Sequence, residues 1–209
     1  MWDQRYAVPD YIYGKEPNDF LVAQAHRLQG QVLSLAEGEG RNAVFLATLG
    51  LSVHGVDSSA VGLAKAEALA RDRGVVIRTE VADLAEFVPA PETYDGVVSI
   101  FAHLPKAIRD RLYPLVEKCL KPGGLLLLEA YSEDQQTRST GGPKDVDRLM
   151  SPAKLLQAFP HLEPLHLWTG DREVWEGTYH RGASAVVQFI ARKPGEGEPE
   201  GFWLPLPSA

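Results

Sequence analysis

The sequence predicts an α/β protein: a single-domain, Rossmann-like, doubly wound sheet of about seven strands, mostly parallel, with an antiparallel C-terminal hairpin strand. Up to residue 131, short apolar runs alternate with helical patterns. The apolar runs are nearly continuous, which is typical of parallel strands that are buried on both faces. After residue 131, two strand-like runs follow each other with no helical pattern between them, which indicates a hairpin. Right-handed crossovers between parallel strands then make the sheet doubly wound.

The apolar runs place the parallel strands. We expect them at residues 31–36, 51–57, 75–84, 94–104 and 125–131. Helical spacing fills the gaps and predicts helices at residues 41–50, 58–74 and 105–120. Ser58 or Ser59 caps the second of these helices and Gly74 ends it.

The C-terminal part of the chain has a different pattern. Residues 132–150 are polar and contain glycines, so we expect a long loop or lid. Ser151 is expected to cap a short helix, and residues 164–193 are expected to form the hairpin. Trp168 and Trp175 are expected to be packing residues. The domain prediction is 1–193, with residues 1–30 as an N-terminal lid and 194–209 as a mobile tail rich in Pro, Gly and Glu.

The composition narrows the class of protein. The formal net charge of −7 argues against nucleic acid as the main partner. A single cysteine excludes a disulfide framework and a cysteine-built zinc site. The N-terminal residues are polar and charged, unlike a signal peptide, and no apolar run could span a bilayer. We therefore expect a soluble cytoplasmic protein without a membrane or nucleic-acid partner; the sequence does not predict its oligomeric state.

A glycine-rich turn carries the first functional signal. Residues 38–43, GEGRNA, fit the G-x-G-x-x-G/A pattern and lie between a predicted strand and a predicted helix. Asp57 ends the next strand, where a carboxylate can accept hydrogen bonds from ribose hydroxyls. The order of strand, glycines, helix, strand and acid predicts a nucleoside-binding site.

Glu37 and Glu39 narrow the choice of ligand. Two carboxylates beside the helix N-terminus would repel a dinucleotide's pyrophosphate. S-adenosylmethionine has ribose hydroxyls for Asp57, a cationic amine and sulfonium, and one carboxylate. That carboxylate can use N–H groups at the start of the helix, with Arg41 as a partner. The turn is therefore predicted to hold a cationic nucleoside.

Several motifs together resemble the class I S-adenosylmethionine-dependent methyltransferases, most closely the branch of tellurite-resistance and thiopurine methyltransferases. They are WDQRY and YGKEPNDFL near the start, then VLSLAEGEGRN, VHGVDSS, VADL, YDGVVSIFAHLP and LKPGG. The resemblance extends to about Lys193. Two positions depart from the family pattern: Ser34 replaces an aspartate, and Ala36 replaces the first glycine. We expect Glu37 to take over part of the role of the missing aspartate.

The resemblance implies roles for particular residues. Asp83 would bind the adenine amino group, with Ala82 and Leu84 around the base, while Ser99 and Ile100 would face the methionine part. Tyr6 or Arg5 would close over the cofactor from a short N-terminal helix that places Trp2 and Tyr6 on one face. The full predicted cofactor set is Tyr6, Ala36, Glu37, Gly38, Gly40, Arg41, Asn42, Asp57, Ser58, Ser59, Ala82, Asp83, Leu84, Ser99 and Ile100.

His103 is the predicted catalytic residue. It follows the fourth strand, at the sheet edge where α/β proteins bind ligands, and could act as a general base or simply bond to the backbone. Glu129, Tyr131 and residues 140–145 are expected at the same edge. His180 is expected at the hairpin, where it either faces the same cleft or, as the simpler interpretation, is a solvated loop residue. No metal site is predicted, because the histidines lack ligand spacing.

These signals predict a methyltransferase that acts on a small-molecule acceptor, such as a thiol, a metalloid oxyanion or a small metabolite, with S-adenosylmethionine as cofactor. Two alternatives remain open at this point. One is an NAD(P)-dependent oxidoreductase on a similar sheet, which the G-x-G-x-x-A match allows. The other is a binder that keeps the nucleoside pocket without catalysis.

Overall fold

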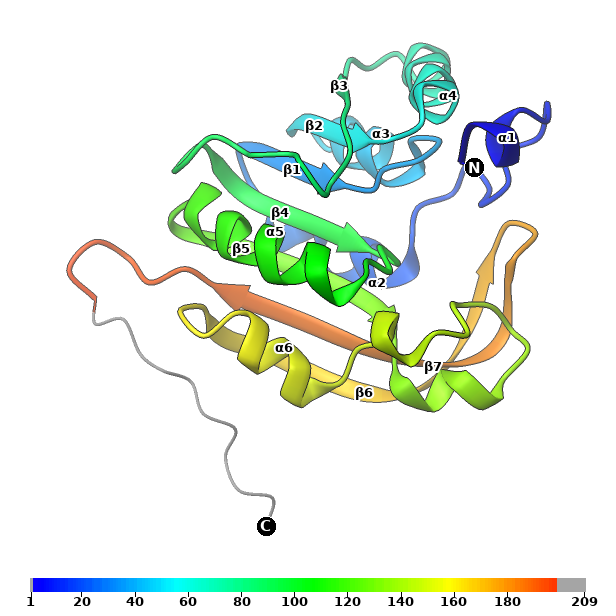
Figure 1. Cartoon of the computed structure of the whole chain (residues 1–209). Helices are drawn as coiled ribbons and strands as arrows, with labels where there is room; N and C mark the ends of the chain where they lie inside the picture. Colours follow the sequence, from blue (N-terminus) through cyan, green and yellow to red (C-terminus); the bar gives the residue numbers. More distant parts are fainter. Residues whose placement is uncertain (1, 199–209) are drawn as a thin grey trace.

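A seven-stranded sheet runs through the middle of the protein and confirms the predicted architecture (Figure 1). The structure is a computed structural model that describes residues 2–198. The strand order is β3-β2-β1-β4-β5-β7-β6. Strands β1 to β5 are parallel, and β7 is antiparallel to both β5 and β6. The strands are β1 (Gln31–Leu35), β2 (Ser52–Asp57), β3 (Arg78–Val81), β4 (Tyr94–Ile100), β5 (Leu120–Tyr131), β6 (Glu163–Glu176) and β7 (His180–Arg192).

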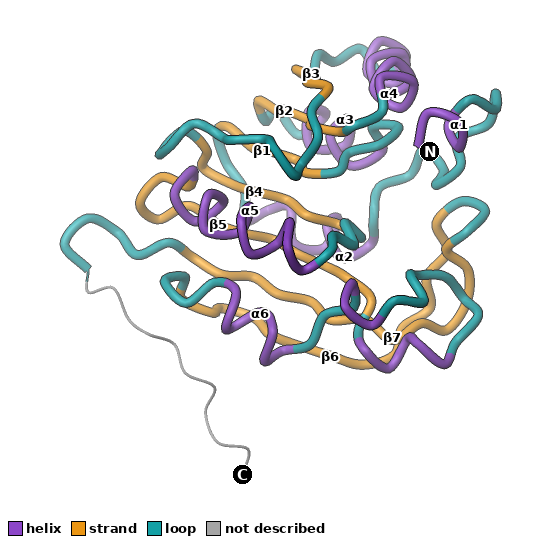
Figure 2. The backbone as a smooth tube through the Cα atoms, viewed as in Figure 1, coloured by secondary structure: helices purple, strands orange, loops and turns teal. Residues whose placement is uncertain are grey.

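Helices cover both faces of the sheet (Figure 2). They are α1 (Trp2–Tyr6), α2 (Asp19–Gln24), α3 (Arg41–Thr48), α4 (Ala60–Asp72), α5 (Lys106–Cys119) and α6 (Pro152–Ala158), with short 3-10 turns η1 (Ala25–Arg27), η2 (Glu133–Thr137) and η3 (Val146–Arg148). Adjacent strand residues face opposite sides. Leu33 therefore packs in the core with α5 and α6, while Val32 packs with α2, α3 and α4. Burial on both faces explains the continuous apolar runs.

The predicted helix starts are confirmed in detail. The Ser59 side chain accepts a hydrogen bond from the Gly62 N–H at 3.0 Å, and Ser151 accepts one from Lys154 at 3.4 Å. Both are N-caps, which satisfy a backbone donor that the helix itself leaves unpaired. The start of α4, next to Asp57, is thus fixed by its own sequence.

Four local predictions are corrected. Strand β4 ends at Ile100 and not at residue 104, because Phe101 adopts a positive φ of 51°, which is incompatible with a strand. Strand β3 is shorter than predicted, because it pairs only with β2 at the sheet edge and Val76 before it is 88% exposed. Strand β5 begins earlier than predicted, because Leu120 pairs with Tyr94 ahead of a register shift. Trp175 is not a packing residue, since it is 69% exposed, whereas Trp168 is 39% exposed and packs its ring over Gly170.

Two segments lie over one end of the sheet. Helix α1 and the tip of the β6–β7 hairpin are far apart in sequence but lie on the same side in Figure 1. The Thr178 N–H donates to the Ile12 carbonyl at 2.7 Å, which joins the hairpin tip to the N-terminal segment. Trp2 and Tyr6 stack at 5.7 Å between ring centroids, so the predicted one-sided helix is confirmed.

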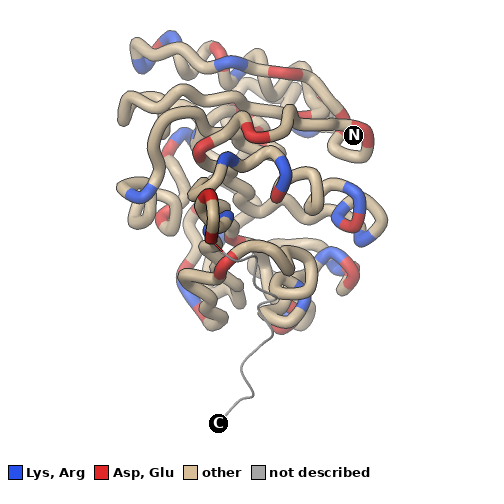
Figure 3. The backbone as a smooth tube through the Cα atoms, turned by 90° about the vertical axis from the view of Figure 1, so that its left-hand side faces the viewer, with Lys and Arg blue, Asp and Glu red and all other residues tan. Residues whose placement is uncertain are grey.

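The charged residues show no strong segregation along the chain. Acidic and basic residues are interspersed along the chain in the view of Figure 3. Within residues 2–198, no helix is both long enough and apolar enough to cross a bilayer. Most of the predicted mobile tail, residues 199–209, lies outside the described residues.

Candidate active site

A cavity of about 900 Å³ opens at the carboxyl ends of the parallel strands. This is the edge where doubly wound sheets bind ligands, beside the point between β1 and β4 where the strand order reverses. The lining residues come from α1 and the following segment, the turn after β1, the ends of β2, β3 and β4, the loop before η3 and the hairpin tip. They include Trp2, Arg5, Tyr6, Tyr13, Ala36, Glu37, Gly38, Glu39, Arg41, Asn42, Asp57, Ser58, Asp83, Leu84, Ile100, Phe101, His103, Leu104, Ile108, Pro143, Lys144, Arg148, Tyr179 and His180.

The glycine turn after β1 is tightly packed against its neighbours. Gly38 and Gly40 have φ angles of 63° and 95°, which favour glycine. A Cβ on Gly40 would lie 2.5 Å from Ala66 in α4, and one on Gly38 would lie 2.8 Å from the Tyr6 hydroxyl oxygen. Ala36 also adopts a positive φ, of 52°. The turn therefore depends on glycine both for conformation and for the close approach of α4 and Tyr6.

Asp57 connects this turn to α4. Its carboxylate accepts hydrogen bonds from the backbone N–H groups of Gly38 and Ser59, both at 2.8 Å. Burial raises the pKa of the Asp57 carboxyl, and these N–H donors oppose that rise. Each carboxylate oxygen can accept more than one hydrogen bond, so Asp57 keeps capacity for the hydroxyls of a ligand.

Glu37 and Glu39 do not present free carboxylates to the cavity, which corrects the electrostatic reason for preferring a cation. Glu37 accepts from the Ala43 N–H at 2.9 Å and from the Ser34 hydroxyl, and burial raises its pKa to about 7. Glu39 accepts from the Ile12 N–H and from Lys65, both at 2.8 Å. Glu37 thus caps α3 from inside the turn, and Glu39 holds the N-terminal segment.

Arg41 is held by a buried charge network. Its Nη2 donates to Glu176 at 2.6 Å, and partners including Arg41 lower the pKa of Glu176 to about 2 although burial alone would raise it. The Asn18 side chain donates hydrogen bonds to both Glu176 and Glu129 at 2.7 Å. Two nitrogens of Arg172, Nε and Nη2, donate to the Glu129 carboxylate. This network joins the N-terminal segment, α3, β5 and the hairpin, so it fixes the direction of Arg41.

One guanidinium nitrogen of Arg41 has no hydrogen-bond partner within the described residues. This nitrogen, Nη1, is buried. Buried donors without partners are uncommon in proteins. Because Arg41 also lines the cavity, the carboxylate of a ligand could pair with this nitrogen.

The other predicted cofactor residues divide into two groups. Ser58, Asp83, Leu84 and Ile100 line the cavity with the residues above, and Asn42 lines it while accepting from the Asn18 N–H at 3.0 Å. Ser59, Ala82 and Ser99 are not among the lining residues. Ser59 caps α4, the Ala82 N–H donates to the Asp57 carbonyl, and Ser99 lies inside β4. These three therefore support the cavity instead of lining it.

His103 lies at the cavity but is badly suited to act as a base. Its Nε2 accepts a hydrogen bond from the Tyr131 N–H at 3.0 Å, so this lone pair is engaged and the proton sits on Nδ1. Burial, together with the nearby His180, lowers its pKa to about 3. The geometry therefore favours the alternative in which His103 bonds to the backbone.

His180 was misjudged from sequence. The ring is not solvated: only 12% of the side chain is exposed, and it lies 4.8 Å from Tyr13 and 4.9 Å from Phe101 between ring centroids. Burial lowers the pKa of His180, although Glu176 behind it acts in the opposite direction. Only the pairing of the hairpin with β5 brings this residue inward, so no local sequence signal could have placed it. Glu129 is also buried, in the network behind the cavity wall.

No metal centre is apparent in the described part of the chain: residues 2–198 contain no group of three or more His, Cys, Asp or Glu residues that could hold an ion.

Comparison with known proteins shows what the chain is similar to. Residues 32–124, from β1 through the start of β5, match the family model described as "Methyltransferase domain". The match covers this segment and not the rest of the chain. A curated protein similar to the chain is the 2-heptyl-1-hydroxyquinolin-4(1H)-one methyltransferase of Mycobacteroides abscessus, 22% identical over 148 residues. The match covers 69% of this chain but only 65% of that protein.

Solved structures share the fold of this chain. One, described as "Conversion of a Disulfide Bond into a Thioacetal Group during Echinomycin Biosynthesis", has a TM-score of 0.75, 22% identity and coverage of 92% of this chain and 91% of its own. TehB from Haemophilus influenzae has a TM-score of 0.69, 20% identity and coverage of 92% and 65%. Phosphoethanolamine N-methyltransferase 2 of Haemonchus contortus, in complex with S-adenosyl-L-methionine, has a TM-score of 0.65, 19% identity and coverage of 92% and 57%.

The cavity of this chain fits S-adenosylmethionine. Asp57 can take ribose hydroxyls, Asp83 and Leu84 lie where the adenine is expected, and the unpartnered Arg41 Nη1 suits a carboxylate. Three N–H groups near the turn, those of Gly38, Gly40 and Ala43, already donate within the chain. A pyrophosphate at this helix N-terminus would find few donors left, whereas a cofactor with one carboxylate needs few.

Proposed function

We propose that this chain transfers a methyl group from S-adenosylmethionine to a small-molecule acceptor by in-line displacement, with residues 1–193 as the methyltransferase domain. One observation supports this most: the glycine turn and Asp57 open into the same cavity as the aromatic and basic residues beyond β4. About 900 Å³ lies at the upper end of the usual range for ligand sites, which leaves room for an acceptor beside the cofactor.

The chain's own residues would act mainly by positioning. S-adenosylmethionine, when bound, supplies an electrophilic methyl group on a sulfonium. Asp57 would hold the ribose, Asp83 and Leu84 the base, and Arg41 the carboxylate. Helix α1 covers the cavity through Tyr6, which is only 4% exposed, and so limits the access of water. Alignment of two bound reactants can account for several powers of ten in rate.

The acceptor class follows from the relatives only in broad terms. The curated relative is named for a hydroxyquinolone acceptor, and we infer a small organic acceptor for this chain as well. Membership of the tellurite-resistance and thiopurine branch stays a prediction, because the similarity to TehB is a similarity of fold. A thiolate or a reduced metalloid would need no base, which agrees with the engaged lone pair of His103.

The two alternatives are weaker. For an NAD(P)-dependent oxidoreductase, the turn has few N–H groups left for a pyrophosphate. A binder without catalysis would need only the cofactor contacts, such as the unpartnered Nη1 of Arg41. The part of the cavity beyond β4, which could hold an acceptor, would then have no function.

An acceptor screen tests the proposal. The purified chain is incubated with S-adenosylmethionine and a panel of thiols, phenols, amines and metalloid oxyanions, and release of S-adenosylhomocysteine is followed. We expect turnover with at least one small acceptor. Tight cofactor binding without turnover across the whole panel would instead favour the non-catalytic binder.

A further inference from the structure

Charge is unevenly distributed along the cavity wall. The acidic lining residues, Glu37, Glu39, Asp57 and Asp83, all come from the turn after β1 or from the ends of β2 and β3. At the other end the charged lining residues that the structure describes are Arg5, Lys144 and Arg148. Glu37 and Glu39 are engaged within the chain, so Asp57 and Asp83 are the acidic groups that face a ligand at the cofactor end, whereas the acceptor end is basic.

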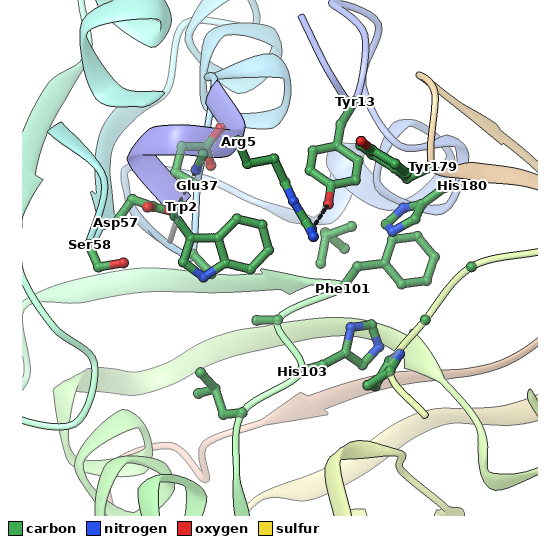
Figure 4. A pocket seen from close by; sticks show the side chains of 18 of the residues that line it. Trp2, Arg5, Tyr13, Glu37, Asp57, Ser58, Phe101, His103, Tyr179 and His180 are labelled. Carbon is green, nitrogen blue, oxygen red and sulfur yellow. Dashed lines mark hydrogen bonds between the residues drawn. The ribbon is translucent and has the colours of Figure 1, made fainter. Parts of the chain in front are cut away.

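Arg5 reaches into the basic end from the lid. Its guanidinium lies 4.8 Å from the centroid of Trp2 and 5.3 Å from that of Tyr179, and Nη1 donates to the Tyr13 hydroxyl at 3.2 Å. Figure 4 shows the side chain pointing toward Tyr13, on the side where Phe101 and His180 lie. The described residues offer Arg5 no carboxylate within ion-pair distance. Its charge is thus available to a ligand.

Arg148 and Lys144 line the cavity from η3 and the loop before it. Arg148 Nε lies 3.6 Å from an Asp145 oxygen, which is within ion-pair distance but beyond hydrogen-bond distance, and its side chain is 42% exposed. Its charge contributes to the lowered pKa of His103, which places it near that ring. Lys144 donates to the Arg138 carbonyl at 2.7 Å, a contact that leaves its charge uncompensated.

Flat rings form part of the cavity wall. Phe101, His103 and His180 line the cavity, and the buried Tyr131 packs behind them, with centroid separations from 4.7 to 5.9 Å within the cluster. Leu104, Ile108 and Pro143 add apolar surface. Such walls favour a planar molecule, because aromatic rings stack on or meet one another edge-on at these separations.

We propose that the acceptor is a planar aromatic molecule with an acidic hydroxyl or thiol group, bound as its anion among Arg5, Lys144 and Arg148; this inference depends on the proposed function. The ionised oxygen or sulfur supplies the electron pair for the new bond to the methyl carbon. The pair of the broken carbon–sulfur bond stays on the cofactor's sulfur, which becomes a neutral thioether. No proton moves in this step, so the rings of His103 and His180 can serve as walls without acting as bases.

Matched acceptors test the charge of the ligand. A naphthol, the corresponding naphthylamine and a series of thiophenols of graded acidity share ring size but differ in the ionisable group. We expect the naphthol and the thiophenols to be methylated with kcat/KM at least about tenfold above the amine. The pH of half-maximal rate should follow the acidity of each acceptor. An amine that reacts equally well or better, or a midpoint that ignores acceptor acidity, would overturn the inference.

Variants test the residues. Arg5 lies on the lid beside Tyr6 and can contact either the cofactor or the acceptor, so a change at Arg5 would not separate the two. Arg148→Gln is therefore the decisive variant. It should raise KM for the naphthol roughly tenfold and for the naphthylamine less than twofold. Binding of S-adenosylmethionine should stay within about twofold, which shows that the site is folded. The control is Arg78→Gln, an exposed residue of β3 outside the cavity. An equal effect on both acceptors would contradict the inference.

Binding separates the two proposals. If no acceptor is methylated, calorimetry still tests the inference about the acceptor. The chain is first saturated with S-adenosylhomocysteine and then titrated with the naphthol or the naphthylamine. Preferential binding of the naphthol supports the inference while leaving the proposed reaction unsupported. Equal binding of the two, or binding of neither, overturns the inference even if the cofactor binds.

Discussion

At the scale of single residues, Asp57 is the point where cofactor binding and local structure meet. Asp57→Asn removes the charge and turns one acceptor oxygen into a donor that faces a backbone N–H group. We expect the dissociation constant of S-adenosylmethionine to rise about 10- to 100-fold, because hydrogen bonds to charged groups contribute about 1.5–3 kcal/mol. Calorimetry measures the effect. Asp110→Asn, an exposed residue of α5, is the matched control and should bind normally.

His103 gives a second test at this scale. His103→Gln offers an amide oxygen that can replace Nε2 as acceptor for the Tyr131 N–H. Turnover on the true acceptor should fall less than about fivefold, with an unchanged pH profile, because a base normally contributes 10²- to 10⁴-fold. A loss of a hundredfold or more, together with loss of one arm of the pH profile, would restore His103 as a base.

Glu37 predicts a dependence of stability on pH. Its folded pKa of about 7 lies above the ordinary 4.5, so the folded state binds this proton more tightly than the unfolded state. The resulting penalty is absent below pH 4.5 and grows to roughly 3 kcal/mol above pH 7. Glu37→Gln keeps an acceptor for the Ala43 N–H and replaces the oxygen that accepts from Ser34 with an amide N–H, to which the Ser34 hydroxyl can turn as an acceptor. Denaturant unfolding should show that this variant loses less stability than the wild type between pH 5 and 8. Parallel curves would contradict the account.

The sequence predicted some of these residues for physical reasons and missed others. Asp57 and Gly38 were predictable because strand, turn and helix follow each other locally. The partner of Arg41, Glu176, is 135 positions away, and only the closed hairpin brings the two together. The inward direction of Glu37 also depends on Gly55 of the neighbouring strand, since a Cβ there would lie 3.1 Å from the Glu37 side chain.

At the scale of elements, Lys65 in α4 holds the N-terminal lid. Its Nζ donates to the Val8 and Asp10 carbonyls and to Glu39, at 2.7, 2.8 and 2.8 Å. Lys65→Met keeps the length of the chain but removes all three contacts. We expect faster hydrogen exchange in residues 2–13 and faster cofactor dissociation, because the lid opens more readily. Lys106→Met, in an exposed pair on α5, is the control. Unchanged exchange would show that other contacts hold the lid.

Most elements were predictable because their signals are local. Helices α4 and α6 carry their own caps, and the β6–β7 hairpin follows from two strand patterns with no helix between them. The lengths of β3 and β5 were not predictable, because they depend on which strands lie at the edge. The exposure of Trp175 has the same cause: hydrophobicity suggests burial, but the residue lies on an edge strand with nothing described against it.

At the scale of the whole molecule, the fold brings an acidic cofactor end and a basic acceptor end into one cavity. The buried network of Asn18, Arg41, Glu129, Arg172 and Glu176 joins four segments behind it. Removal of one partner of such a network leaves a buried charge unpaired, which is costly. The position of the hairpin and the direction of Arg41 are therefore set together.

Calorimetric titration of the purified chain with S-adenosylmethionine and, separately, with NAD tests the central claim most directly. The account predicts one S-adenosylmethionine bound per chain, weakened by Asp57→Asn, and no detectable binding of NAD. Binding of NAD in the same cavity, with S-adenosylmethionine excluded or unbound, would contradict it.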